Sequence, residues 1–298
     1  MSGDSGIGDP YWYEWSVGLT YVLEMLDPGS SIVSVTLQQK GEKGLDDVII
    51  RFANGDARFI QVKHTRSEDT LTFGDLVGEG EKGEPALLCR LAAAWLAEVG
   101  RATGECQAGL VSNRAAGQRH GRGRSGGGID RPPLADFLPL LAGEVAKANK
   151  LGDICMPPEW QEAWVREWLP QLKPLESEEL KLKFLRHLRI EPSAVGLEQL
   201  GEQLLSKIRA LFSVDVDAAV RLRSLLDGAL RIWATSLRGS AQAITREAAY
   251  EKLCLADDSP VGEHALAPPA PFFGTRLPVA EQIASLLVAR AAPVVFLV

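Results

Sequence analysis

The chain has 298 residues, a formal net charge of −7, 46% hydrophobic residues and 24% charged residues. This composition is that of an ordinary globular protein, and it excludes a disordered chain, a collagen and a disulfide scaffold. The negative charge argues against a protein that coats nucleic acid through its overall charge, but a local basic surface remains open. At roughly 150 residues per domain, the length predicts two domains.

The cysteines and the apolar runs predict the compartment. The four cysteines are far apart and form no Cys-x-x-Cys motif; they are Cys89, Cys106, Cys155 and Cys254. We expect no signal peptide, and therefore buried thiols in a reducing cytoplasm. No apolar run reaches the roughly 18 residues that a membrane-spanning helix needs, so we expect a cytoplasmic protein without a membrane partner.

The first part of the chain predicts a mixed α/β sheet. Asp9-Pro10 is typical of a helix start, and apolar residues then recur at helical spacing until Pro28-Gly29. Asn54-Gly55 is the strongest short hairpin signal, and it joins two strand candidates. A helix is predicted at Pro85–Val99. The strand candidates are Ser31–Gln38, Asp47–Phe52, Ala57–Lys63 and Gln107–Ser112. Strands followed by a helix and a further strand favour a mixed sheet.

From Phe137 onward the pattern is helical. Trp160, Trp164 and Trp168 recur every four residues. We interpret them as core or as a docking face rather than as an exposed base-stacking ladder. Further helices are predicted at Leu197–Phe212, Val220–Leu237, Arg246–Leu255 and Glu281–Arg290, with a linker at Asp257–Pro271 and a strand at Ala292–Val298. We therefore expect a core domain at 1–135, a helical region at 136–257, and a linker with the start of a further domain at 258–298.

One constellation of polar residues suits phosphodiester hydrolysis. The hairpin places Asp47 level with about position 62, at the same end of the hairpin as Gln61 and Lys63. Gln61 and Lys63 are two residues apart and so share one face of their strand. Carboxylate and amide oxygens suit Mg²⁺, and a neighbouring lysine can orient water or stabilise the charge that develops on phosphate. Glu14, on the first helix, could add another oxygen. The alternative is that Gln-x-Lys is only the polar face of a strand.

These residues resemble a known family. The order Glu14 on a helix, Leu45-Asp46-Asp47-Val48-Ile49 opening a strand, and Phe59-Ile60-Gln61-Val62-Lys63 on its partner resembles the PD-(D/E)XK nucleases. More closely, four segments are similar to effector nucleases of bacterial anti-phage systems, namely cyclic-oligonucleotide (CBASS) effectors and the nuclease domains in front of antiviral STAND ATPases. The segments are Tyr13-Glu14-Trp15, Asp46-Asp47-Val48, Ile60-Gln61-Val62-Lys63-His64 and Val111-Ser112-Asn113-Arg114.

The resemblance implies a restriction-endonuclease-like mixed sheet flanked by helices, followed by an all-helical region. It implies an endonuclease that cleaves double-stranded DNA with little sequence preference. Its metal would be Mg²⁺, with Mn²⁺ as an alternative, held by Asp47, Glu14 and Gln61, and its catalytic lysine would be Lys63. Asp46 remains an alternative to Asp47. Because Gln61 replaces the acid usual at that position, a non-catalytic nucleic-acid-binding or oligomerisation module is the second hypothesis.

The end of the chain resembles the start of a STAND nucleotide-binding domain, in Phe272-Phe273-Gly274-Thr275-Arg276 and Pro293–Val298. The glycine-rich phosphate loop would come after these residues, so we expect no ATP site within this chain. The resemblance also implies homo-oligomers of the full-length protein and a phage-derived trigger sensed by regions outside this chain.

The stretch Ala115–Pro133 is rich in glycine and arginine and predicts a mobile loop. We expect it to contact the DNA backbone together with basic residues near Lys63, while a solvated loop without a partner is the alternative. The expected nucleic-acid-binding residues are Arg114, Arg119, Arg122, Arg124, His64 and Arg66.

Overall fold

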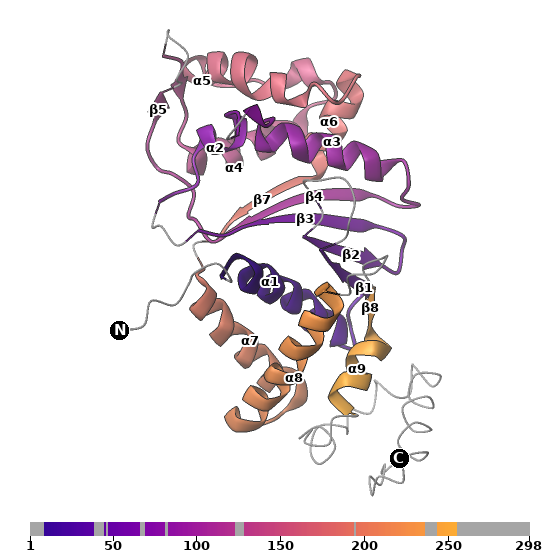
Figure 1. The fold of residues 1–298 in the computed structure, drawn as a ribbon. Helices are drawn as coiled ribbons and strands as arrows, with labels where there is room; N and C mark the ends of the chain where they lie inside the picture. The colour runs from indigo at the N-terminus through magenta and orange to yellow at the C-terminus, as the bar shows by residue number, and fades with distance from the viewer. Residues whose placement is uncertain are drawn as a thin grey trace, which may run out of the picture. The chain divides into compact units, whose positions relative to one another are not determined.

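The structure is a computed structural model that describes residues 9–38, 45, 47–65, 69–80, 83–122, 128–193, 195–235 and 243–254 (Figure 1). Its elements in chain order are α1 (Asp9–Leu26), β1 (Ile32–Leu37), β2 (Val48–Phe52), β3 (Ala57–Lys63), α2 (Phe73–Val77), α3 (Leu87–Val99), β4 (Cys106–Ser112), β5 (Gly121–Arg122), β6 (Asp130–Arg131), α4 (Leu134–Lys147), η2 (Leu151–Asp153), α5 (Pro158–Ala163), η3 (Trp164–Trp168), η4 (Leu169–Leu172), α6 (Glu178–His187), β7 (Leu188–Pro192), α7 (Leu197–Phe212), α8 (Val216–Thr235), β8 (Ile244–Thr245) and α9 (Arg246–Cys254).

A six-stranded sheet in the order β7-β4-β3-β2-β1-β8 confirms the predicted mixed α/β class. Strand β4 pairs in parallel with both β3 and β7, whereas β1 pairs antiparallel with β8. The expected helical region is helical except for β7 and β8, which both join the sheet. Neither strand has a strong sequence signal, because β8 has two residues and β7 is an edge strand with exposed charged positions.

The described residues divide into two compact units. Those of the first unit fall within 1–14, 38–49 and 54–196, and those of the second fall within 15–37, 50–53 and 197–298. This division differs from the boundary that we expected between residues 135 and 136, because α4, α5 and α6 belong to the first unit. The expected linker, helix and strand beyond residue 257 lie outside the described residues.

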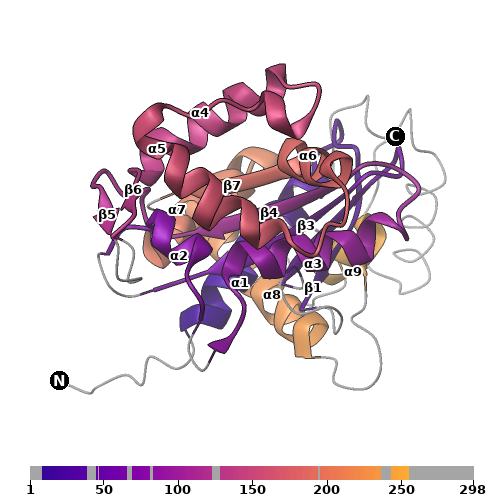
Figure 2. The same ribbon diagram turned by 90° about the horizontal axis from the view of Figure 1, so that it is seen from above.

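The core of the first unit lies between the helices α2 to α6 and one face of β3 and β4. Ala57 and Phe59 share this face of β3, and they belong to one buried cluster with residues of α2, α3, α4 and α6. Figure 2 shows these helices over β3, β4 and β7. Trp95 joins the two layers, because its indole N–H donates to the Cys106 carbonyl oxygen at 2.8 Å. Strand β4 is buried along almost its whole length, as expected of a central parallel strand.

The tryptophan stripe is core, which confirms the first of the interpretations offered from its spacing. Trp164 and Trp168 are 3% and 0% exposed, and Trp168 packs against the rings of Phe73 and Phe137. The segment η3 is a π-helix in which the Leu169 N–H donates to the Trp164 carbonyl. Pro170, which has no N–H, follows directly, and the chain continues as the 3₁₀ segment η4.

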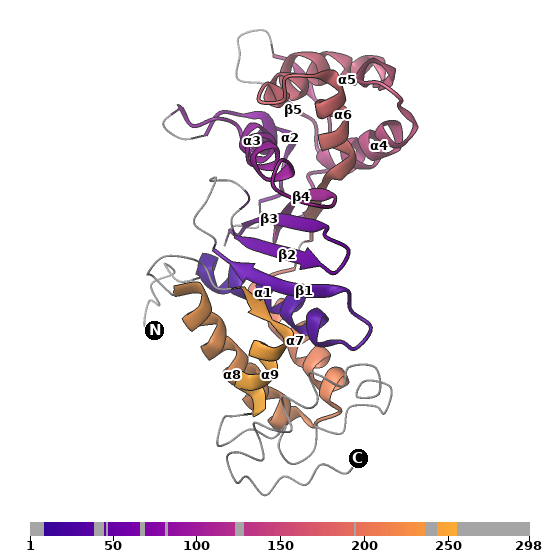
Figure 3. The same ribbon diagram turned by 90° about the vertical axis from the view of Figure 1, so that its right-hand side faces the viewer.

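In the second unit, α8 packs against β1 and α9 against β8, while α7 packs against α8 (Figure 3). Arg246, at the start of α9, is 5% exposed and donates to three carbonyl oxygens at the end of α1 and the turn after it. The shortest of these bonds joins Arg246 Nε to the Met25 oxygen at 2.7 Å. A cation at a helix C-terminus is favoured by the helix dipole, so Arg246 stabilises the end of α1.

Part of the stretch predicted as a loop has regular structure. Strands β5 and β6 form a two-stranded antiparallel sheet, and Leu71 and Ala116 form a parallel bridge. Arg131 of β6 binds Glu167 of η3, with Nε to Oε2 at 2.7 Å and Nη2 to Oε1 at 2.8 Å. This paired contact explains why the end of the stretch is fixed although the sequence has no periodicity there.

The fold tests the expected burial of the cysteines and the expected lack of a membrane-spanning helix. Cys89 and Cys106 are buried as expected, but Cys155 is exposed, because it follows η2 at the surface of the first unit. The side chain of Cys254 lies outside the described residues. No helix within the described ranges is both long enough and apolar enough to cross a membrane.

The Arg131–Glu167 pair supports a stability prediction. The two side chains are only 18% and 11% exposed, so Glu167→Gln leaves a guanidinium largely desolvated without its counter-charge. We expect the free energy of unfolding, measured by urea denaturation, to fall by about 1–3 kcal/mol. The matched control is Glu162→Gln, which breaks a pair with Arg166 whose side chains are 65% and 55% exposed. Equal losses from the two variants would contradict the prediction.

Candidate functional site

The candidate site lies at the carboxyl ends of β3, β4 and β7. These strands run in parallel, so their last residues meet at one edge of the sheet, with Lys63 level with Ser112 and Ser112 level with Pro192. The β2–β3 turn is the predicted Asn54-Gly55, where Gly55 has a φ of 88°. Carboxyl ends of parallel strands are a common place for ligand sites in α/β folds.

Asp47, Gln61 and the backbone of Val62 form the centre of the site. Asp47 Oδ2 accepts the Val62 N–H at 2.7 Å and also accepts a hydrogen bond from the Gln61 side-chain amide. Gln61 is only 6% exposed, and Asp47 is half-buried. The structure therefore brings together Asp47 and Gln61, as the hairpin predicted.

Lys63 shares one face of β3 with Gln61, since the two are separated by one residue of an extended strand. Whereas Gln61 is buried, Lys63 is half-exposed at the last position of the strand. The side chain of Lys63 makes no hydrogen bond or ion pair with any residue in the described part of the chain. Its ammonium group is thus available to a ligand at the edge where Asp47 lies.

Glu14 connects to Asp47 through a residue that the sequence did not single out. The Gln38 side-chain amide donates to Glu14 Oε2 at 3.0 Å, and the Gln38 backbone N–H donates to the Asp47 carbonyl at 2.9 Å. No motif or spacing marks Gln38, which is simply the last residue of a predicted strand. Gln38 stands out only in the structure, where its φ of 47° is unusual for a residue other than glycine.

By residue type, the predicted donors suit a hard divalent cation. Mg²⁺ is bound in proteins by one or two carboxylates, with water and substrate phosphate completing its octahedron. Asp47 and Glu14 supply carboxylates, and Gln61 supplies an amide. No group of three or more His, Cys, Asp or Glu residues suited to a metal ion occurs within the described ranges. The predicted metal site would therefore have few protein ligands. Asp46, the alternative to Asp47, lies outside the described residues.

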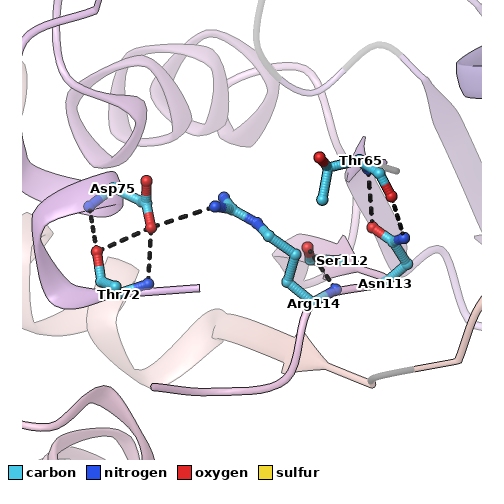
Figure 4. Close-up of polar contacts among 6 residues, drawn as sticks. All are labelled: Thr65, Thr72, Asp75, Ser112, Asn113 and Arg114. Carbon is cyan, nitrogen blue, oxygen red and sulfur yellow. Dashed lines mark hydrogen bonds and ion pairs between the residues drawn. The ribbon is translucent and has the colours of Figure 1, made fainter. Parts of the chain in front are cut away.

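A second cluster holds the ends of β3 and β4 together (Figure 4). The Asn113 side chain accepts the Thr65 N–H at 2.9 Å and donates to the Thr65 carbonyl at 2.6 Å. The Asn113 backbone N–H donates to the Lys63 carbonyl at 3.4 Å. In this way one side chain continues the strand pairing beyond Lys63, and it fixes the backbone on which Lys63 is carried.

Arg114, the next residue, reaches a different partner. Its guanidinium lies 3.4 Å from Asp75 Oδ2, and its backbone N–H donates to Ser112 Oγ at 3.2 Å (Figure 4). Asp75 also forms a capping box with Thr72 at the start of α2. The Arg114 and Asp75 side chains are 21% and 36% exposed, so the pair is partly buried, and its 3.4 Å separation is longer than the 2.7 Å between Arg131 and Glu167.

Tyr13 and His64 meet on the other side of Lys63. Their ring centroids are 4.9 Å apart, and Tyr13 is 1% exposed. Burial raises the pKa of the Tyr13 phenol, and a hydrogen bond with Ser193 opposes this shift. His64 is half-exposed and carries its ring against a buried tyrosine, which gives it a fixed position next to Lys63.

The remaining basic residues of the predicted interface are only partly described. Arg119 is exposed, and Arg122 belongs to β5, but nothing is described of its side chain. Arg66 and Arg124 lie outside the described residues. The structure therefore places Arg114 and His64 beside the candidate site, and leaves the rest of the predicted interface as a prediction.

Comparison with known proteins gives distant structural similarity alone. No family model matches the sequence, and no curated protein matches it. The structure is similar to that of Acinetobacter baumannii Cap4, a SAVED/CARF-domain containing receptor, with the cyclic trinucleotide 2′3′3′-cAAA; the TM-score is 0.43 at 8% identity, over 85% of this chain and 45% of that chain. The same receptor with 3′3′3′-cAAA gives 0.41 at 9% identity, over the same shares. The chain spans less than half the length of these receptors.

The role of Asn113 can be tested without assuming any activity. In Asn113→Ala, the Thr65 backbone loses both hydrogen bonds to the Asn113 side chain. At about 1 kcal/mol per hydrogen bond, we expect amide exchange in residues 61–65 to accelerate by about 30-fold. The matched control is Gln107→Ala, which breaks the side-chain bond to Arg58 between the same two strands at their other end. Unchanged exchange at Thr65 in Asn113→Ala would contradict the assignment.

Proposed function

We propose that this chain is a metal-dependent endonuclease that hydrolyses phosphodiester bonds of double-stranded DNA with little sequence preference. The observation that supports it is the contact of the Asp47 carboxylate with Gln61 and Val62. This contact fixes a carboxylate beside an amide, and the amide is two residues before Lys63, whose ammonium group is available. This is the arrangement that the PD-(D/E)XK resemblance implies. The contacts of Asp47 are observed in this chain, and the nuclease activity is what we propose from them.

Each residue has a distinct part in this proposal. Asp47 and Glu14 would hold the cation, with the Gln61 amide as a neutral third donor. When bound, Mg²⁺ or Mn²⁺ lowers the pKa of water and offsets charge on the scissile phosphate. Lys63 orients the attacking water and stabilises the negative charge that develops on the phosphate. Burial of Gln61 keeps bulk water from one side of the site.

DNA would bind through local positive charge, since the chain as a whole carries −7. Arg114 lies at the same sheet edge as Lys63, and His64 lies beside it. Arg119 is exposed in the stretch that follows Arg114 and would contact the backbone farther along the duplex. Binding of this kind is sensitive to salt because it releases counterions from DNA.

The wider role of the protein is also a proposal, and it rests on the sequence resemblance. We place the nuclease in the cytoplasm as the effector part of a longer anti-phage protein. A phage-derived trigger would be sensed by regions outside this chain, and homo-oligomers would form in the full-length protein.

A non-catalytic nucleic-acid-binding module is the second candidate. Two observations favour it: Gln61 stands where an acid is usual, and the described residues offer no group of three or more His, Cys, Asp or Glu for a metal ion. Such a module would use the same basic residues and would bind DNA without cleaving it. The two candidates differ in a single outcome, which is strand scission.

Cleavage of supercoiled plasmid separates the two candidates. We expect nicking and linearisation with Mg²⁺ or Mn²⁺ and none with EDTA. Lys63→Ala should lower the rate at least about 100-fold, because it removes a charge that stabilises the transition state. Lys183→Ala, on the exposed face of α6, is the matched control and should cleave as the wild type does. An activated full-length protein that leaves plasmid intact would sink the nuclease proposal and favour the binding module.

The role of Arg114 is tested by salt dependence rather than by rate. If Arg114 contacts one phosphate, Arg114→Ala should reduce the slope of log K against log salt by about 1 in a binding assay. Arg101→Ala serves as control, because it removes a 67% exposed arginine, paired with Glu98, at the other end of the sheet. An unchanged slope in Arg114→Ala would remove Arg114 from the interface.

A further inference from the structure

Gln38 has a backbone conformation that its residue type does not favour. Its φ is 47°, in the left-handed region where side chains other than those of glycine, asparagine and aspartate are disfavoured. Among the described residues, the only other residue besides glycine with positive φ is Ser213. Ser213 directly follows the last residue of α7, where left-handed residues commonly end helices. Gln38 follows a strand, so a helix end does not explain it.

The contacts of Gln38 join two of the candidate metal ligands. Its backbone N–H donates to the Asp47 carbonyl at 2.9 Å, and its side-chain amide donates to Glu14 Oε2 at 3.0 Å. The side chain is half-buried, so water competes less for this bond than it would at the surface. Gln38 thus connects the backbone of Asp47 to the carboxylate of Glu14. Glu14 lies 24 residues before Gln38 in the sequence.

An amide is well suited to hold a carboxylate that must bind a cation. A lysine or arginine in this place would neutralise the Glu14 charge, whereas a glutamine N–H orients the carboxylate and leaves its charge intact. Residues that support metal ligands in this way often affect metal affinity about 10- to 100-fold. Strained backbone at non-glycine residues is also concentrated at functional sites, where the surrounding contacts maintain it.

We propose that Gln38 is a positioning residue that holds the Glu14 carboxylate toward the divalent cation, at the expense of local conformational strain. This inference rests on the proposed metal-dependent function and deepens it. The inference predicts two opposite effects of Gln38: it should lower the stability of the fold and raise the affinity of the site for the divalent cation.

The test compares Gln38→Gly with Ser213→Gly, which relieves the same kind of strain at the other left-handed residue. Both variants should unfold at a urea midpoint equal to or higher than that of the wild type, because glycine adopts positive φ without steric cost. Only Gln38→Gly should weaken Mn²⁺ binding, by about 10-fold or more in titration calorimetry without DNA. Gln38→Met, which keeps the side-chain length but lacks the donor, should weaken Mn²⁺ binding to the same extent.

The outcomes separate the inference from the function on which it rests. If the wild type binds Mn²⁺ and cleaves DNA while Gln38→Gly and Gln38→Met bind Mn²⁺ with unchanged affinity, Gln38 has no positioning role and the nuclease proposal stands. A Gln38→Gly variant that loses stability together with affinity would show that the amide is structural, and would also overturn the inference. If wild type and Ser213→Gly neither bind Mn²⁺ nor cleave, the proposed function and the inference fail together.

Discussion

The hydrogen bond from the Val62 N–H to the Asp47 carboxylate is the contact on which the site depends. A backbone N–H in a buried strand must find an acceptor, and here a side-chain carboxylate provides it at 2.7 Å. Asp47 therefore has a fixed place before any ligand arrives. Because Val62 is followed by Lys63, the same bond sets the separation between the carboxylate and the end of β3. The proposed chemistry thus uses geometry that the sheet already requires for its own stability.

Gln61 changes the energetics of this arrangement relative to a second acid. Two carboxylates in contact within a buried edge repel one another, so that one of them has its pKa raised until a cation binds. An amide next to Asp47 instead donates a hydrogen bond, which holds the site together in the absence of metal. The same bond must be shared or broken when Asp47 takes a cation. A site of this composition would be well ordered when empty, and its affinity for metal would depend strongly on the remaining carboxylate, Glu14.

Local patterns in the sequence predicted what local physics controls. Asn54-Gly55 specified the hairpin, since Gly55 adopts the positive φ that such a turn requires, and strand alternation placed Gln61 and Lys63 on one face. The features that the sequence did not predict, β7 and the role of Gln38, depend on contacts between residues far apart in the chain. Strand β7 joins β4 across a long stretch of chain, and Gln38 donates to the Glu14 carboxylate 24 residues before it. No short window of sequence contains both partners of either contact.

The arginines show why a count of charges overstates a DNA interface. Arg131 stands in the arginine-rich stretch, but it is 18% exposed and bound to Glu167, so its charge stabilises the fold. Arg246 is buried on the carbonyl oxygens at the end of α1. Arg114 is partly buried too, but it lies 3.4 Å from Asp75, so its pair is longer than that of Arg131 and Glu167. Of these three, only Arg114 lies at the sheet edge that carries Lys63, so DNA binding here should use few phosphate contacts and should depend only weakly on salt.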